Sequence, residues 1–142
     1  MKNIAVIGVG DIGSRHLQAL AHLENFNLFS VDPSFEALDL ASKMYTEVKT
    51  VGSPELYPLS DINKLPQNLF TVIMATNSRH RYPATKVLLE KKIKFIIFEK
   101  VLFQQLDEYN DIEEQLIDNG ISSYVNCWPR TIKYFIKLKE KI

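Results

Sequence analysis

The hydrophobic positions of this chain alternate between short continuous apolar runs and longer segments with helical spacing. Short apolar runs predict buried strands, and they occur at Ile4–Ile7, Asn27–Val31, Glu47–Val51 (the weakest), Phe70–Ala75, Lys94–Phe98 and Ile121–Asn126. Segments whose apolar residues recur every three or four positions predict helices, and they occur at Gly13–Glu24, Phe35–Tyr45, Tyr82–Lys91, Gln104–Asp118 and, as the start of a further helix, Thr131–Ile142. The pattern therefore predicts strands and helices in regular alternation.

Residues that favour helix ends support several of these boundaries. Ser34 is a good N-cap for the helix that starts at Phe35. Pro83 is predicted in the first turn of its helix, where a missing N–H does no harm. Between residues 52 and 66 the prolines and a Ser60-Asp61 turn leave room for little more than one short helix.

Alternating strands and helices predict βαβ units around a parallel sheet. Right-handed crossovers then make a doubly wound α/β domain the expected fold. We predict a Rossmann domain of three α/β/α layers with about six strands. Residues 1–130 are expected to form this domain. Residues 131–142 are expected to begin a helix that leads to a C-terminal domain missing from the chain, so no second domain is present.

Composition narrows the class of protein further. The 142 residues carry no net charge, with 17 basic and 17 acidic side chains, and 46% of them are hydrophobic. This balance suits one folded domain and excludes a disordered tail. It also gives no electrostatic reason to expect nucleic acid or a membrane surface as partner. A single cysteine, no Cys/His set with metal spacing and no long apolar segment predict a soluble cytoplasmic protein without a metal site.

The strongest local motif is the run Gly8-Val9-Gly10-Asp11-Ile12-Gly13. It lies between a predicted strand and a predicted helix, which is where a dinucleotide-binding G-x-G-x-x-G belongs. The first glycine permits a tight turn, the second lets a pyrophosphate approach the backbone, and the third lets helix and strand pack closely. The amides that begin the helix, at Asp11 and Ile12, then face the anion. The alternative is a glycine-rich turn that holds no ligand.

Asp32 adds a second feature to this motif. It ends the second predicted strand 19 residues after Gly13, close to the spacing of about 20 expected for the acid that binds the adenosine ribose. A carboxylate there accepts hydrogen bonds from ribose hydroxyls and repels a 2′-phosphate. No Arg or Lys follows in residues 33–36 to hold such a phosphate. We therefore predict NAD rather than NADP, although an Asp that only initiates an Asp-Pro turn is the simpler reading.

Four segments carry a family resemblance: Ile4–His16, Val72–His80, Phe98–Leu102 and Val125–Leu138. Together they resemble the N-terminal domain of the Gfo/Idh/MocA oxidoreductases, the relatives of glucose-fructose oxidoreductase and inositol dehydrogenase. Gly8–Gly13 with His16 is similar to the opening motif of that family, and Ala75-Thr76-Asn77-Ser78 is similar to its fourth-strand loop. Phe98-Glu99-Lys100 is similar to its Glu-Lys-Pro motif. The resemblance extends to members linked to surface-polysaccharide sugar metabolism.

The resemblance implies roles for residues that the pattern alone does not assign. Thr76, Asn77, His80 and Glu99 are implied to bind the cofactor, and Lys100 is implied to act at the substrate hydroxyl. A lysine at the end of a central strand also lies where doubly wound sheets bind ligands, and a lysine of lowered pKa can be neutral and so able to take a proton. A solvated lysine after a buried strand is the alternative. The chain departs from the family at Val101, which replaces a proline, and in a Thr76–His80 interval that looks one residue shorter.

The remaining candidates have simpler readings. His16 is predicted to pack beneath the dinucleotide rather than to take part in catalysis. Cys127 is expected to be a small residue at a strand end, because no partner for a nucleophile lies near it in sequence. Trp128 and Arg130 fall where they would cover or bridge the cofactor, and the lysines of residues 137–141 fit the solvated face of a helix end.

Together these features predict the NAD-binding half of an enzyme that transfers a hydride between NAD and a secondary alcohol of a sugar, polyol or nucleotide sugar. In this reading the chain is an excised piece or a truncated gene product, and the partners are a dinucleotide and a sugar-like substrate. One alternative is a non-catalytic dinucleotide-binding or assembly module, a homo-oligomer included, which exposed Tyr134, Phe135 and Leu138 would favour. A domain that binds S-adenosylmethionine, as in methyltransferases, is the other.

Overall fold

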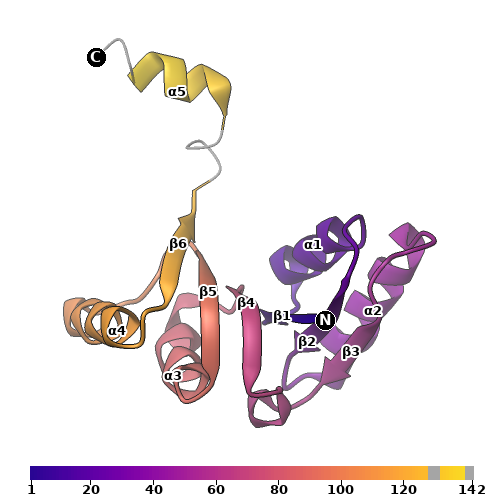
Figure 1. The fold of residues 1–142 in the computed structure, drawn as a ribbon, viewed down its shortest axis with the longest axis horizontal. Coiled ribbons are helices and arrows are strands. Elements are labelled where there is room, and N and C mark those ends of the chain that lie inside the picture. The colour runs from indigo at the N-terminus through magenta and orange to yellow at the C-terminus, as the bar shows by residue number, and fades with distance from the viewer. Residues whose placement is uncertain (128–131, 140–142) are drawn as a thin grey trace.

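A six-stranded sheet organises the chain, in the order β3-β2-β1-β4-β5-β6 and with every neighbouring pair parallel. Figure 1 shows this computed structural model, which describes residues 1–127 and 132–139. The strands are β1 Lys2–Ile7, β2 Phe26–Val31, β3 Leu56–Leu59, β4 Asn68–Met74, β5 Lys92–Glu99 and β6 Ser122–Asn126. The helices are α1 Asp11–Leu20, α2 Phe35–Val48, α3 Ser78–Leu89, α4 Leu106–Asp118 and α5 Lys133–Lys139, with a short 3-10 helix η1 at Ile62–Lys64.

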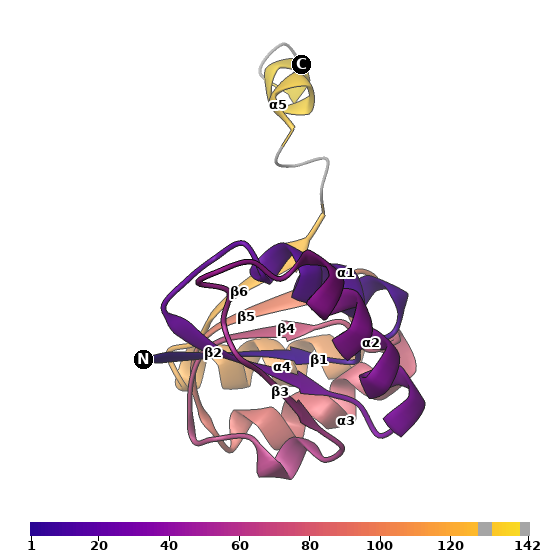
Figure 2. The same cartoon turned by 90° about the vertical axis from the view of Figure 1, so that its right-hand side faces the viewer.

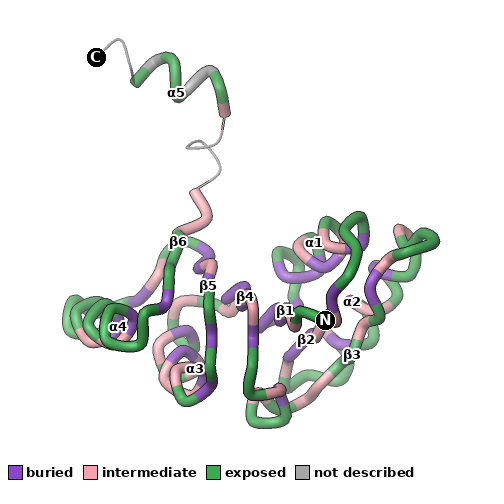
Figure 3. Tube along the Cα trace, in the orientation of Figure 1, coloured by how far each residue is buried: buried purple, intermediate pink, exposed green. Residues whose placement is uncertain are grey.

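Two apolar clusters hold the helices against the two faces of the sheet. On one face, Leu17 of α1 and Leu38 of α2 pack with strand residues such as Val6. On the other, Leu88 of α3 and Ile112 of α4 pack with a second set of strand side chains. Buried positions therefore concentrate along the strands and at intervals along these helices (Figure 3). The predicted doubly wound Rossmann fold with three layers and six strands is confirmed.

The strand order fixes where a ligand can bind. The chain passes from β1 outward to β2 and β3, then returns to place β4 on the other side of β1. The segments that follow β1 and β4 therefore leave the sheet in opposite directions, since α1 and α3 lie on opposite faces. Such a reversal opens a crevice at the carboxyl ends of the strands, which is where doubly wound sheets bind their ligands.

The third strand was placed wrongly by the sequence pattern. Residues predicted as the strand Glu47–Val51 instead continue α2 to Val48 and then turn, while β3 forms at Leu56–Leu59. The helix continues because Tyr45 is buried, and its hydroxyl donates to the Pro54 carbonyl at 2.5 Å. Pro58 lies inside β3, which is tolerated because β3 is at the edge of the sheet.

The start of α3 was also placed too late. Asn77 caps the helix by accepting a hydrogen bond from the His80 amide at 3.2 Å, so α3 begins at Ser78 rather than Tyr82. Pro83 consequently lies in the second turn instead of the first. Its missing N–H would have bonded the carbonyl of Arg79, which is exposed to water.

The last described element, α5, lies apart from the sheet in both ribbon views (Figures 1 and 2). It falls inside the helix predicted at 131–142. The side chains of Tyr134, Phe135 and Leu138, and residues Trp128 and Arg130, lie outside the described part of the chain. Across residues 1–127 and 132–139, no helix has the length and apolar character needed to cross a membrane.

Candidate functional site

A cleft of about 570 Å³ opens at the carboxyl ends of the strands, at the point where the strand order reverses. Its walls come from the β1–α1 turn, the end of β2, the segment after β3 and the β4–α3 turn. The predicted site residues that line it are Gly8, Gly10, Asp32, Thr76, Asn77 and His80. The fold thus brings together residues from four separate parts of the chain. No group of three metal-binding side chains occurs among the residues that the structure describes.

The three glycines of the β1–α1 turn meet different surroundings. A Cβ on Gly13 would lie 1.9 Å from the Gly8 carbonyl oxygen, and a Cβ on Gly8 would lie 2.7 Å from the Thr76 nitrogen. Gly8 also has a φ of +83°, which disfavours any other residue. A Cβ on Gly10, by contrast, would meet no atom within 4 Å, because Gly10 borders the cleft. The first and third glycines are needed for folding, and the second leaves open space in front of the helix.

The start of α1 supplies hydrogen-bond donors to this open space. Gly10 is the N-cap residue, and no side-chain oxygen caps the helix. The first amides of a helix have no partner within it, and here they include those of Asp11 and Ile12, whose side chains are exposed. An uncapped helix start beside an open cleft is suited to an anion. Gly13 is buried and packs directly against Gly8.

Asp32 follows directly on β2 and is tied to the glycine turn. One carboxylate oxygen accepts from the Val9 amide at 3.0 Å, and the other accepts from the Ser34 amide at 2.9 Å. Val9 is therefore engaged within the protein. Each carboxylate oxygen has a further lone pair, and Asp32 is only half-buried at the cleft wall. The Val9 amide therefore joins the glycine turn to Asp32, and the carboxylate of Asp32 keeps lone pairs for a ligand in the cleft.

The β4–α3 turn forms a further part of the cleft wall. Asn77 uses its side-chain oxygen to cap α3, and His80 is exposed in the first turn of that helix. The Thr76 hydroxyl is buried without a hydrogen-bond partner among the described residues. These three residues line the same cleft as Gly8, Gly10 and Asp32, and the Thr76 backbone lies directly against Gly8.

Glu99 ends β5 and lies outside the lining of the cleft. Its carboxylate is buried and accepts hydrogen bonds from His16 Nε2 at 2.8 Å and from the Asn126 side-chain amide. Burial by itself raises the pKa of Glu99, but the hydrogen bonds from Asn126 and His16 outweigh it, so the pKa lies below its ordinary value. His16 therefore links α1 to the end of β5, and its predicted packing beneath a dinucleotide stays a prediction.

Lys100 follows Glu99 at the same edge of the sheet. The register that pairs Met74 with Phe98 places the segments after β4 and β5 side by side. The Lys100 side chain is exposed and does not line the cleft, and the peptide bond between Lys100 and Val101 is cis. The predicted catalytic lysine thus lies near the cleft wall formed by Thr76, without bordering the cleft itself.

Sequence reasoning missed two features of the site. Ser60 and Asp61 border the cleft after β3, and they were treated as a turn because the third strand was misplaced. Arg81 is 2% exposed, although it stands in a polar run of the sequence that gives no sign of burial. Burial lowers the pKa of Arg81, and the nearby charge of Glu99 partly opposes this. The available signal was the helix N-cap at Asn77, because a helix that begins there places Arg81 on the same buried face as Thr85 and Leu88.

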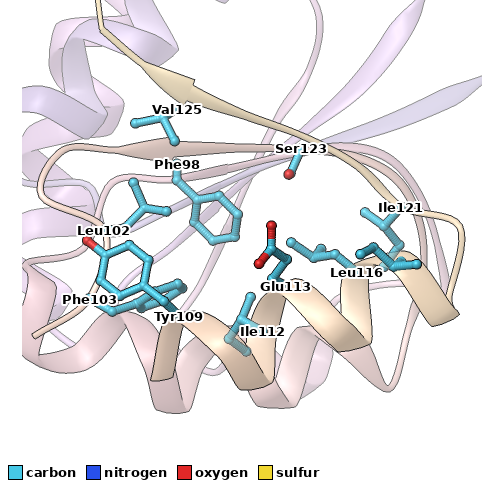
Figure 4. A pocket seen from close by; sticks show the side chains of 11 residues that line it. Phe98, Leu102, Phe103, Tyr109, Ile112, Glu113, Leu116, Ile121, Ser123 and Val125 are labelled. Carbon is cyan, nitrogen blue, oxygen red and sulfur yellow. The ribbon is translucent and has the colours of Figure 1, made fainter. Parts of the chain in front are cut away.

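A second hollow, of about 280 Å³, lies between α4 and β6 (Figure 4). Its walls are mainly apolar and include Phe98, Phe103 and Ile112, with the Glu113 carboxylate at its centre. None of the predicted site residues borders it. The predicted site residues that border a hollow are therefore gathered at the first cleft.

Comparison with solved structures identifies the fold. Myo-inositol dehydrogenase from Lactobacillus casei, determined with NAD(H) and myo-inositol, matches 99% of this chain with a TM-score of 0.80 and 20% identity. UDP-N-acetylglucosamine 3-dehydrogenase from Acidithiobacillus ferrooxidans matches 98% with a TM-score of 0.76 and 16% identity. Biliverdin reductase from Synechocystis, determined with biliverdin and NADP⁺, matches 87% with a TM-score of 0.70 and 12% identity.

The chain spans 41% of the length of each of the two dehydrogenases and 37% of the reductase. It therefore shares the fold of one part of these proteins, and the family resemblance in the sequence is confirmed at the level of the fold. No family model matches the sequence. No curated protein matches it either.

Proposed function

We propose that this chain is the NAD-binding domain of an oxidoreductase of the Gfo/Idh/MocA family, which transfers a hydride between NAD and a secondary alcohol of a sugar, polyol or nucleotide sugar. The observation that carries the proposal is the open space at Gly10, flanked by uncapped helix amides and by Asp32. In doubly wound folds, the diphosphate of a dinucleotide binds to a glycine turn and the helix amides that follow it, and an acid binds the ribose. When bound, NAD supplies the hydride acceptor.

The residues around the cleft fit the parts of a dinucleotide. In this proposal the amides of Asp11 and Ile12 bind the diphosphate, and Gly10 allows it to approach the backbone. Asp32 accepts from the adenosine ribose hydroxyls and repels a 2′-phosphate. Asp61, which also lines the cleft, adds a second negative charge that disfavours the 2′-phosphate of NADP. Thr76, Asn77 and His80 hold the opposite side of the cofactor.

Glu99 and Lys100 have separate roles in this proposal. Glu99 accepts hydrogen bonds from His16 and Asn126, and these hydrogen bonds fix the end of β5 beside the cofactor. Lys100 is exposed beside that end, where its ammonium can hydrogen-bond a substrate hydroxyl and its neutral amine would accept the proton of that hydroxyl. The substrate itself belongs to the proposal for the whole enzyme, because this chain covers less than half of the matched dehydrogenases.

Calorimetric titration of the chain with NAD⁺ tests the proposal. The unaltered chain binds NAD⁺, and Gly10→Ala weakens binding by at least about tenfold, because the added methyl occupies the space of the diphosphate. Urea denaturation of Gly10→Ala is the control for folding, because its added Cβ meets no atom and changes the free energy of unfolding by less than about 0.5 kcal/mol. Equal affinities for NAD⁺ in the unaltered chain and Gly10→Ala contradict the proposal.

Two alternatives are separated by related measurements. S-adenosylmethionine has no diphosphate, so it leaves the open space at Gly10 unused; if it displaces NADH from the chain, the methyltransferase-like reading gains. A non-catalytic binding module is favoured by the position of Lys100 outside the cleft lining. That interpretation predicts no dehydrogenase activity in a protein that contains this chain, whereas the proposal predicts an activity that Lys100→Met largely abolishes.

A further inference from the structure

The guanidinium of Arg81 is buried against main-chain carbonyls rather than a carboxylate. Its Nη1 donates to the carbonyl oxygens of Glu99 and Val101 and, at 3.3 Å, to that of Leu102. Its Nη2 donates to the carbonyl oxygen of Thr76. One cation thus binds four carbonyls from two loops that are more than twenty residues apart in the sequence.

The position of these carbonyls gives the contact its significance. Thr76 belongs to the turn that lines the cleft. Glu99 and Val101 flank Lys100 on both sides, and Leu102 follows. The backbone on each side of Lys100 is therefore fixed by Arg81, while the lysine side chain stays exposed. Arg81 is the direct bridge between the cleft wall and the loop that carries Lys100.

The chemistry of this bridge requires arginine. A buried cation is unfavourable unless its donors find acceptors. Charge-assisted hydrogen bonds from Nη1 and Nη2 to several carbonyls stabilise this one, while Nε has no partner among the described residues. The planar guanidinium presents donors in a fixed fork, whereas a lysine ammonium is a compact point charge. Only the fork reaches Thr76 through one nitrogen and the Lys100 loop through the other.

We propose that Arg81 is a positioning residue that couples the two loops, so that a dinucleotide bound at Thr76 restrains the backbone of Lys100. This inference rests on the proposed function for its cofactor, but the bridge itself is a property of the chain without ligand. Arg81 is not among the residues that line the cleft, so the proposal assigns it no contact with cofactor or substrate. Its effect passes through the carbonyls that it binds.

Amide hydrogen exchange, measured residue by residue by NMR, tests the coupling. In the unaltered chain, NAD⁺ slows exchange at Thr76 and Asn77 and also at Val101 and Leu102. In Arg81→Lys, NAD⁺ still slows exchange at Thr76. The amides of Val101 and Leu102 then exchange about tenfold faster and no longer respond to NAD⁺, because local opening is freed from the cleft wall.

The control must also remove a buried cation from backbone carbonyls. Lys91 is 9% exposed, and its Nζ donates to the Leu65 carbonyl at 3.0 Å and the Asn63 carbonyl at 3.3 Å, next to the start of β5. Lys91→Met leaves exchange at Val101 and Leu102 unchanged relative to the core amide of Val6. Faster exchange in Arg81→Lys that is uniform over Val6 and Val101 indicates general destabilisation and overturns the proposal.

The outcomes separate this inference from the function on which it rests. If NAD⁺ leaves the Thr76 amide unaffected in the unaltered chain, the proposed function fails, and the ligand-free comparison still decides whether Arg81 holds the loop. Unchanged exchange at Val101 in Arg81→Lys overturns the inference. Should Arg81→Lys not fold, the unaltered chain decides: the bridge predicts slowly exchanging Nη protons on Arg81, and rapid exchange of those protons contradicts it.

Discussion

The turn after β1 and the loop after β5 stand at the same edge of the sheet, but different forces shape them. The first depends on glycines, since a Cβ on Gly8 or Gly13 would collide with neighbouring backbone atoms. The second is shaped by present side chains, because Arg81, His16 and Asn126 come from α3, α1 and β6 to hold residues 99–102. A six-residue motif determines the first, and the completed fold determines the second.

The largest effect is expected at the turn. Gly13→Ala places a Cβ 1.9 Å from the Gly8 carbonyl, and such overpacking of backbone against backbone lowers the free energy of unfolding by about 3 kcal/mol. Gly10→Ala changes it by less than about 0.5 kcal/mol, because its Cβ meets no atom. Urea denaturation measures both. Similar losses in the two variants contradict the division of roles between these glycines.

The next effect concerns the loop. Glu99→Ala leaves His16 Nε2 and the Asn126 amide without their acceptor, which lowers the free energy of unfolding by about 1–3 kcal/mol. The exposed carboxylate of Glu114 on α4 gives a matched control, and Glu114→Ala changes stability by less than about 0.5 kcal/mol. Thermal unfolding compares the two. Equal stabilities show that the loop does not depend on these side chains.

A smaller effect is expected on cofactor choice. Asp32→Asn removes the charge that repels a 2′-phosphate, so the preference for NAD⁺ over NADP⁺ falls by about tenfold. Asp39, which pairs with Lys43 on the surface of α2, provides the control, because Asp39→Asn leaves the preference unchanged. Calorimetry with both dinucleotides gives the ratio. An unchanged ratio in Asp32→Asn removes the ribose assignment.

The smallest effect is on the pH dependence of stability. The pKa of Glu99 is lowered in the folded chain, because hydrogen bonds from Asn126 and His16 outweigh the opposing effect of burial. The stabilisation is therefore present above the ordinary Glu pKa and is lost as the pH falls through the lowered value. Glu99→Gln removes this part of the acid-induced loss, so its stability changes less between neutral and acid pH. If the free energy of unfolding depends on pH in the same way in the unaltered chain and in Glu99→Gln, the lowered pKa of Glu99 is contradicted.

The same contrast explains what could be predicted from the sequence. The strand runs and the Gly8–Gly13 motif are local patterns, and the fold, the turn and the place of Asp32 followed from them. The edge strand β3 carries Pro58 and little apolar signal, so its position and the cleft residues Ser60 and Asp61 were missed. Arg81 was missed because its carbonyl partners come together only when β4 and β5 pair.

The central claim is that the space in front of Gly10 holds a diphosphate. A crystal structure of the chain grown with NAD⁺ tests it most directly. The account predicts the diphosphate at the amides of Asp11 and Ile12, with the adenosine ribose on the Asp32 carboxylate. A dinucleotide found elsewhere, for example in the apolar hollow between α4 and β6 (Figure 4), with the space at Gly10 empty, would contradict it.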